Sequence, residues 1–226
     1  MSNAAPLPQA VKEKIVAYWG DGLLHETYGS TEGGIVTNLR PQHQLTSRQS
    51  VGPAFALNQI RLVDRAGNEV ESGAVGELFS ASPYTFSGYW NQPEEPVSSS
   101  LEGWVSAGDL ARRDDDGFYY IVDRKKDMVV SGGINIYPRE IEEVLHEHPA
   151  LLEAAVIGVP DDYFGESLHA FVVVRPGMHI DPEALDAHCR VFLAGYKIPK
   201  KFSFISALPR NAGGKVLKKE LRDIAR

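Results

Sequence analysis

Residues Tyr28 to Gly34 combine an aromatic ring, hydroxyl groups, a carboxylate and bare glycine amides in one short segment. An aromatic ring can stack on a base, and hydroxyl and amide groups can hydrogen-bond a phosphate. A carboxylate oxygen is a ligand that Mg²⁺ accepts. A strand expected at residues 23–28 would end at this segment. Glycine-rich turns are common between elements, so an ordinary turn is the alternative explanation.

Three further segments carry residue types that suit a phosphorylated ligand. Asp109 follows a glycine at a strand edge, where a carboxylate can hydrogen-bond a ribose diol. A charge run at 123–127 precedes Gly133, which would let a narrow substrate pass close to the backbone. Lys215 follows a glycine pair and could reach a phosphate as a point charge, but Val216 after it excludes a Walker P-loop. Taken alone, each is more often a turn or a solvated charged face.

Composition excludes several classes of protein. The chain has 226 residues and a net charge of −7, which argues against a strongly basic nucleic-acid binder and allows one or two domains. No 20-residue apolar run marks a membrane span. Cys189 is the single cysteine, so a disulfide scaffold is excluded and a reducing, cytoplasmic setting is favoured. We expect Cys189 to be a buried, inert thiol. The seven histidines lack metal-ligand spacing.

The first half of the chain is predicted to be mostly β. Val11, Ile15, Val16 and Trp19 recur at helical spacing and predict an amphipathic helix over 6–19. The remaining elements expected in this half are strands at 23–28, 51–64 and 75–80, a turn at 64–68, and two strands within 104–122 around a turn at 114–117.

The second half is predicted to be a small α+β unit in the order strand, helix, strand, strand, helix, strand, helix. Pro138 suits the first turn of its first helix, and Asp181 suits the cap of its second. The elements expected are a helix at 137–148, strands at 154–159 and 170–175, a helix at 181–192, a strand at 202–207 and a helix at 218–225. The whole chain is therefore assigned to the α/β (α+β) class.

The change in pattern predicts a domain boundary near Arg124, in the charge run 123–127. Residues 1–4 look like a cloning scar and carry no expectation of structure. The expected organisation is a β-rich subdomain of a large domain at 5–123 and a small mobile domain at 124–226.

The order and spacing of these segments resemble the C-terminal part of the AMP-forming acyl-CoA synthetases, members of the adenylate-forming superfamily. The segments that carry the resemblance are Tyr28–Glu32, Gly76–Leu78, Gly88–Asn91, Gly103–Leu110, Asp123–Asp127, Gly132–Glu142 and Gly213–Lys215. The resemblance implies a two-step ligase that uses ATP, Mg²⁺ and coenzyme A. A carboxylic acid is first joined to AMP with release of pyrophosphate, and the acyl group then passes to the CoA thiol with release of AMP.

The resemblance also implies a role for individual residues. Tyr28 would stack on adenine, Gly29 would line that pocket, and Ser30 would belong to the nucleotide-binding set. Thr31 would bind the α-phosphate and Glu32 would help to hold Mg²⁺. The roles implied for the remaining positions are ribose binding for Asp109 with help from Arg124, the interdomain hinge for Lys126, the pantetheine tunnel for Gly133, and binding of carboxylate and phosphate oxygens for Lys215.

The family's upstream phosphate loop and most of its acyl pocket are not in this sequence, and Ala5-Pro6-Leu7-Pro8 looks like the tail of a longer motif. The chain is therefore expected to be an inactive fragment of a ligase that could self-associate through a surface exposed by truncation. Two alternatives remain. One is a truncated, non-catalytic nucleotide- or partner-binding module, and the other is an adenylation domain of another branch, such as luciferases or peptide synthetases.

Overall fold

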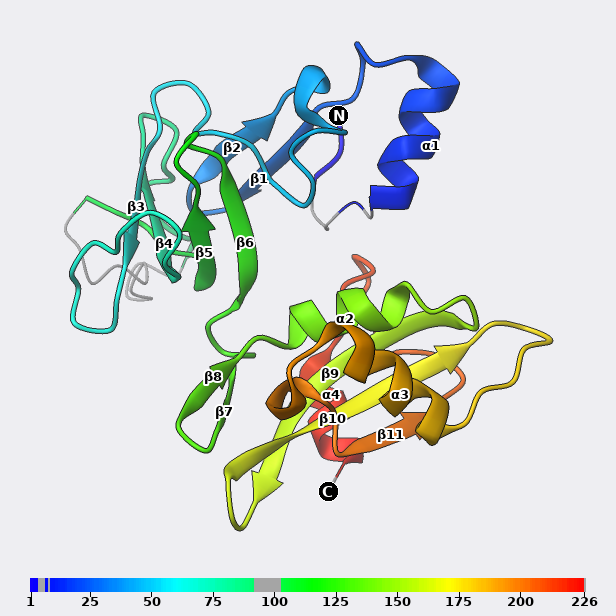
Figure 1. Ribbon diagram of the computed structural model, residues 1–226. Coiled ribbons are helices and arrows are strands. Elements are labelled where there is room, and N and C mark those ends of the chain that lie inside the picture. The colour runs from blue at the N-terminus through cyan, green and yellow to red at the C-terminus, as the bar shows by residue number, and fades with distance from the viewer. Residues whose placement is uncertain (4–6, 8, 92–102, 226) are drawn as a thin grey trace. The chain divides into compact units, whose positions relative to one another are not determined.

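The computed structural model describes residues 1–3, 7, 9–91 and 103–225 (Figure 1). The chain divides into two compact units, Met1–Lys125 and Lys126–Arg226. The first consists mainly of antiparallel strands and the second of a mixed sheet with helices, which confirms the α+β class. The predicted helix start at Pro6 and Pro8 lies outside the described residues.

The first unit contains one helix, a two-stranded hairpin and a four-stranded antiparallel sheet of order β3-β4-β5-β6. Its elements are α1 (Gln9–Trp19), β1 (Glu26–Ser30), β2 (Gly34–Leu39), a 3-10 turn (Pro41–His43), β3 (Gln59–Val63), β4 (Gly76–Ala81), β5 (Asp109–Arg113) and β6 (Tyr119–Arg124). The strand predicted over 51–64 forms only at β3, and β2 was not predicted. Ser2, in the stretch given no expected structure, pairs with Glu26 of β1.

The turn predicted at 114–117 joins β5 to β6. Asp114 accepts hydrogen bonds from the backbone N–H groups of Gly117 and Phe118, the latter at 2.8 Å through its side chain. Gly117 has a φ of +83°, a conformation in which glycine is favoured. The predicted hairpin is confirmed.

Residues 50–54 tie the β1–β2 hairpin to the four-stranded sheet. The N–H of Val51 donates to the carbonyl of Tyr119 at 2.9 Å, and the N–H of Asn38 donates to Pro53 at 3.1 Å. Between them, Gly52 has a φ of +90°, and a Cβ there would lie 2.3 Å from the backbone of Asn38. Only glycine allows the two sheets to approach this closely.

Helix α1 does not bury the apolar face expected from its spacing. Val11 and Trp19 are 39% and 62% exposed, whereas Lys12 is 1% exposed. The ammonium of Lys12 forms an ion pair with the carboxylate of Glu26 on β1, which is also buried. A buried carboxylate requires a compensating charge, so the helix turns a lysine inward.

The second unit is a five-stranded sheet with three α-helices among its described residues. Its elements are β7 (Val129–Ser131), β8 (Ile134–Ile136), α2 (Pro138–His146), β9 (Leu151–Asp161), β10 (Gly165–Val174), α3 (Pro182–Phe192), a 3-10 turn (Gly195–Lys197), β11 (Lys201–Phe204) and α4 (Lys218–Ile224). The predicted order is confirmed, with the first strand present as the β7–β8 hairpin. Strands β9 and β10 are each longer than the strands predicted at 154–159 and 170–175.

The two faces of the β9–β10 pair carry separate cores. Alternate residues such as Val156 and Ala170 pack with α2 and α3, and the intervening ones, such as Ile157 and Phe171, pack with Leu221 of α4 (Figure 1). The side chain of Asp181 caps α3 by accepting the N–H of Ala184 at 2.8 Å, as predicted.

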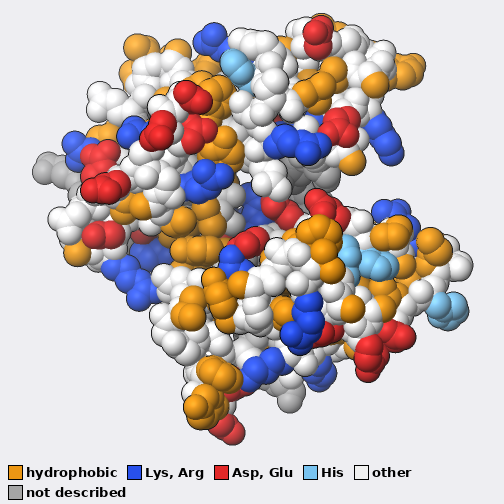
Figure 2. Space-filling view, viewed as in Figure 1, with side chains coloured by type: hydrophobic (Ala, Val, Ile, Leu, Met, Phe, Trp, Pro, Cys, Tyr) orange, Lys and Arg blue, Asp and Glu red, His pale blue; other side chains and the backbone are white. Residues whose placement is uncertain are grey.

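Basic and acidic side chains are interspersed on the face shown in Figure 2. In the second unit, Lys197 pairs with Glu140 and Lys200 pairs with Asp161, both at partly exposed positions. Such pairs each contribute at most about 1 kcal/mol, so the cores provide most of the stability. None of the described helices has the length and hydrophobicity that a bilayer crossing requires.

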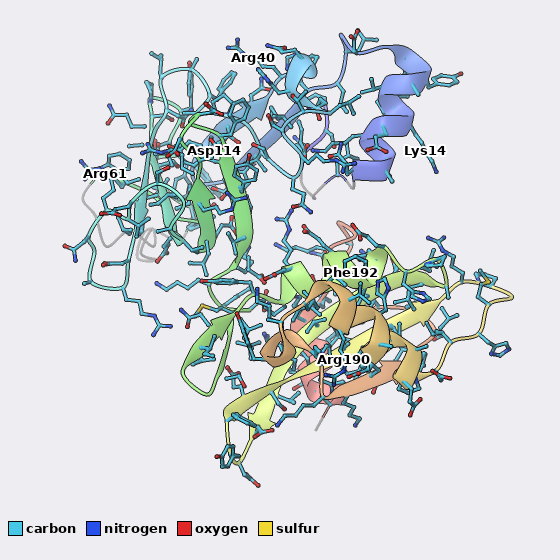
Figure 3. All side chains as sticks on the ribbon, in the orientation of Figure 1. Lys14, Arg40, Arg61, Asp114, Arg190 and Phe192 are labelled. Carbon is cyan, nitrogen blue, oxygen red and sulfur yellow. The ribbon has the colours of Figure 1, made fainter. Side chains whose placement is uncertain are left out.

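The buried Lys12–Glu26 pair predicts a large effect of one substitution. In Lys12→Ala, the carboxylate of Glu26 stays buried without its cation, and we expect a loss of about 3–5 kcal/mol in the free energy of unfolding. Urea denaturation measures it. The control is Lys14→Ala, which removes an exposed lysine from the same helix (Figure 3). Equal losses in the two variants would contradict the importance of the buried pair.

The single cysteine provides a second prediction. Cys189 is 0% exposed on α3, and burial raises the pKa of its thiol to about 11. At pH 8 the folded chain should therefore react negligibly with Ellman's reagent, and one thiol should react once urea unfolds it. Rapid reaction of the folded chain would contradict the burial of Cys189.

Candidate functional site

The segment Tyr28 to Gly34 forms the end of the β1–β2 hairpin. Ser30 pairs with Gly34, so Thr31, Glu32 and Gly33 form the connecting turn. The Ser30 hydroxyl accepts the N–H of Gly33 at 3.0 Å. A Cβ at Gly33 would lie 2.8 Å from Oγ of Ser80 on β4, so the turn is closely packed there. The predicted turn exists, as part of a hairpin whose second strand was not predicted.

Three of the sequence-predicted residues meet beside this hairpin. The hydroxyl of Tyr28 donates to Oδ2 of Asp109 at 2.6 Å, and Nε of Arg124 lies 2.7 Å from Oδ1 of the same carboxylate. Asp109 begins β5 and Arg124 ends β6, and the register of these two strands places them opposite one another. Both oxygens of a buried carboxylate are thus bound. A second bond, from Nη1 of Arg124 to the carbonyl of Ala107 at 3.2 Å, fixes the guanidinium.

The electrostatic surroundings hold Tyr28 protonated. Burial and the adjacent Asp109 carboxylate raise its pKa well above the ordinary value, and Arg124 opposes them only in part. Tyr28 is therefore a permanent hydrogen-bond donor with an aromatic face.

Glu32 lies in the turn as an ionised carboxylate. Partial burial opposes its ionisation, but hydrogen bonds from Tyr89, from its own backbone N–H and from Ser30 outweigh burial and lower its pKa. The hydroxyl of Tyr89 donates to Oε1, and the ring of Phe86 packs edge-on against Tyr89 at 5.0 Å. Tyr89 was quoted in the sequence pattern without a role.

These groups suit a nucleotide with its metal. Asp109 offers oxygen acceptors to hydroxyl groups, and Tyr28 offers a ring near them. Mg²⁺ is commonly held by one or two carboxylates together with substrate phosphates, and the ionised Glu32 fits that donor set. No cluster of three or more metal-ligating side chains occurs within 1–3, 7, 9–91 and 103–225.

Gly132 and Gly133 form the two-residue turn of the β7–β8 hairpin in the second unit. Their φ angles of +57° and +80° are those of a left-handed turn that matches the strand twist. A Cβ at Gly133 would meet nothing within 4 Å, and that residue is exposed. The backbone conformation, rather than crowding within the unit, requires glycine at Gly133.

Lys215 lies in a small hairpin at the exposed side of the second unit. Arg210 pairs with Val216, and Asn211 exchanges backbone and side-chain hydrogen bonds with Lys215 at 2.9–3.0 Å. The guanidinium of Arg210 anchors this hairpin to Glu153 on β9 at 2.5 Å. The loop therefore presents an exposed lysine from a fixed base.

A cleft of about 420 Å³ opens on the second unit beside the β7–β8 hairpin. Gly132, Phe164, Arg190, Tyr196 and Lys200 are among its lining residues, and Figure 3 shows Arg190 on α3. The two cations are each paired, Arg190 with an aspartate of its own helix at 2.5 Å and Lys200 with the acid at the end of β9 at 2.7 Å. This cleft was not predicted from the sequence.

The cleft residues had one local signal that could have found them. The run from Gly195 to Lys201 places an aromatic ring just before three lysines and leads into β11. Because Arg190 and Phe164 come from distant elements, only the fold shows that they share the cleft.

Two family models match the chain. The model described as AMP-binding enzyme matches residues 1–90, and the model described as AMP-binding enzyme C-terminal domain matches residues 140–215. A long-chain-fatty-acid–CoA ligase of Bacillus subtilis is 41% identical over 222 residues, covering 98% of this chain and 40% of the relative. The chain thus spans about 40% of the length of the curated relatives it matches.

Solved structures agree with these sequence matches. The amide bond synthetase McbA from Marinactinospora thermotolerans superposes with a TM-score of 0.90 at 33% identity, covering 99% of this chain and 45% of that one. The o-succinylbenzoate CoA synthetase of Bacillus subtilis, in complex with its acyl-adenylate intermediate, gives a TM-score of 0.88 at 34% identity, covering 98% and 45%.

The family models, the sequence relatives and the structural neighbours all indicate one group of enzymes. The chain belongs to the family of AMP-binding, adenylate-forming enzymes.

Proposed function

We propose that this chain forms part of an ATP-dependent carboxylate–CoA ligase. In the first step a carboxylate oxygen attacks the α-phosphorus of ATP, and the bond to the bridging oxygen breaks to release pyrophosphate. In the second, the CoA sulfur attacks the acyl carbon, and the C–O bond to AMP breaks. The observation that carries the proposal is the buried Asp109 carboxylate, held between Tyr28 and Arg124 in a chain of this family.

The nucleotide side of the proposed site lies in the first unit. Asp109 would accept the ribose hydroxyl groups, with Arg124 holding the carboxylate in place. Tyr28 would offer its ring to adenine, and Gly29 would line that pocket. Ser30, the last residue of β1, and Thr31, the first residue of the turn, would supply hydroxyl groups for the α-phosphate. Their positions on one hairpin end support this assignment.

Glu32 would hold Mg²⁺ beside the phosphates. The metal would neutralise phosphate charge during the transfer. The lowered pKa of Glu32 supports this role because an ionised carboxylate is the form that binds the cation. A structure of the o-succinylbenzoate CoA synthetase of Bacillus subtilis is described with ATP and a magnesium ion.

Lys215 would provide positive charge to the reacting oxygens during adenylation. Its exposed loop, anchored by Arg210, supports delivery of the ammonium to a site outside its own unit. Adenylation requires this lysine, whereas thioester formation requires space for the thiol. Rotation of the second unit about Lys126 would serve both steps.

The cleft beside the β7–β8 hairpin would hold the phosphorylated end of CoA. The Tyr196 ring could pack on its base, while Arg190 and Lys200 could bind phosphate oxygens. Gly133, in the adjoining turn, would line the path of the pantetheine arm. A fatty acid–[acyl-carrier-protein] ligase and an amide bond synthetase are also similar to this chain, so the acceptor of the second step has its own test below.

The proposed setting is cytoplasmic, which the single, buried thiol of Cys189 supports. No nucleic-acid partner is proposed for a chain of net charge −7.

Lys215→Ala tests the adenylation step in the whole enzyme. We expect acid-dependent pyrophosphate exchange to fall about 10²–10³-fold, because a charge aimed at the transition state is lost. Lys219→Ala, which removes an exposed lysine from α4, is the matched control and should leave exchange unchanged. Unchanged exchange in Lys215→Ala would refute its proposed role, and absence of exchange in the unaltered enzyme would favour a non-catalytic module.

Lys200→Ala tests the thiol step. We expect the KM for CoA to rise about tenfold while pyrophosphate exchange stays unchanged, because a charged hydrogen bond to phosphate contributes roughly 1.5–3 kcal/mol. This change is more informative than Gly133→Leu, since the φ of +80° at Gly133 strains any side chain there. An unaltered KM for CoA would place the cofactor elsewhere.

A further inference from the structure

The last residues of the first unit are held by the loop before β5 and by a side chain of β4. The N–H of Lys125 donates to the carbonyl of Gly108 at 2.8 Å, and its ammonium lies 2.6 Å from Oε2 of Glu77 on β4. Glu77 in turn accepts the hydroxyl of Ser106 at 2.8 Å. Arg124, one residue earlier, is bound to Ala107 in the same loop. The chain is thus fixed to the first unit up to Lys125.

The first attachment of the chain to the second unit is two residues later, at Asp127. The carboxylate of Asp127 is buried and accepts Nη2 of Arg222 at 2.9 Å. Arg222 lies on α4. The preceding residue of that helix, Leu221, is 0% exposed in the core of this unit. Val129, at the start of β7, is 1% exposed. Asp127 and the residues after it therefore belong to the body of the second unit.

Between these two attachments lies one residue, Lys126. It is exposed, and the division between the compact units falls immediately before it. Rotating one unit against the other requires changes of backbone φ and ψ where the chain is not held. With Lys125 and Asp127 both attached, these changes are concentrated at Lys126.

We propose that Glu77 and Arg222 are positioning residues that confine the pivot of this protein to Lys126. Glu77 fixes the chain before the pivot, and Arg222 fixes it after the pivot. Their use in changing between two half-reactions rests on the proposed function, whereas the confinement itself rests only on the contacts above. Without either attachment the pivot would widen, and the second unit would reach its orientations less reproducibly.

Backbone ¹⁵N relaxation of this chain tests the confinement without any activity. We expect backbone N–H order parameters of about 0.85 at Lys125 and Asp127, and below about 0.6 at Lys126. In Glu77→Ala the low values should extend to Lys125, and in Arg222→Ala they should extend to Asp127. Arg222→Lys retains a cation and should restore the high order parameter at Asp127. Arg48→Ala, which removes an arginine–glutamate pair elsewhere in the first unit, is the control and should leave all three values unchanged.

The results separate the two levels of the proposal. Low order parameters over 124–128 in the unaltered chain, or a profile unchanged in both variants, would overturn the confinement. In the whole enzyme, Arg222→Ala should slow overall thioester formation by up to about 10²-fold, since small misplacements cost that much. Wider disorder without any loss of rate would support the attachments and refute their use in a two-step reaction.

Discussion

The first unit depends on one buried carboxylate. Asp109 is 6% exposed, and Arg124 and Tyr28 bind both of its carboxylate oxygens, which offsets the loss of hydration on burial. The Arg124 contact requires the β5–β6 register, and the Tyr28 contact requires the β1–β2 hairpin to lie against the larger sheet. The close approach at Gly52 brings those sheets together. The contacts of this one carboxylate therefore require a fixed position of the β1–β2 hairpin against the larger sheet, and a glycine at Gly52. The carboxylate is also the proposed ribose-binding group.

The second unit is organised around the long β9–β10 pair. A hydrophobic core lies on each face of this pair. The surrounding turns are attached to a rigid base even where their own side chains contribute nothing to either core. Lys215 and Gly133 lie in hairpin turns outside these cores, and the cleft opens beside the second of these turns. This arrangement would suit the proposed rotation of the unit, because groups on its surface could meet different surroundings while its interior stays the same.

Many of the helices and turns could be predicted from the preferences of single residues. Pro138, Asp181 and Gly117 each have a strong conformational preference, and the elements that they begin or join formed where expected. The failures have a different cause. The inward orientation of Lys12 depends on Glu26, and the cleft depends on Phe164 and Arg190 lying along the same hollow. Such pairings come from distant parts of the chain and leave no periodic pattern. The meeting of Tyr28 with Asp109 and Arg124 was implied only by resemblance, since 81 residues separate the first two.

The separate cores have a consequence for how such proteins diversify. Each of the hydrophobic clusters among the described residues draws its members from one side of Lys126 only. A genetic crossover between Lys125 and Lys126 would leave every one of these clusters with its original members. Substitutions on one side can accumulate without repacking the other. Recombination at this point is therefore a route by which a half with the proposed nucleotide site could acquire a different second half. It is also a natural place to join parts of two relatives in a chimera.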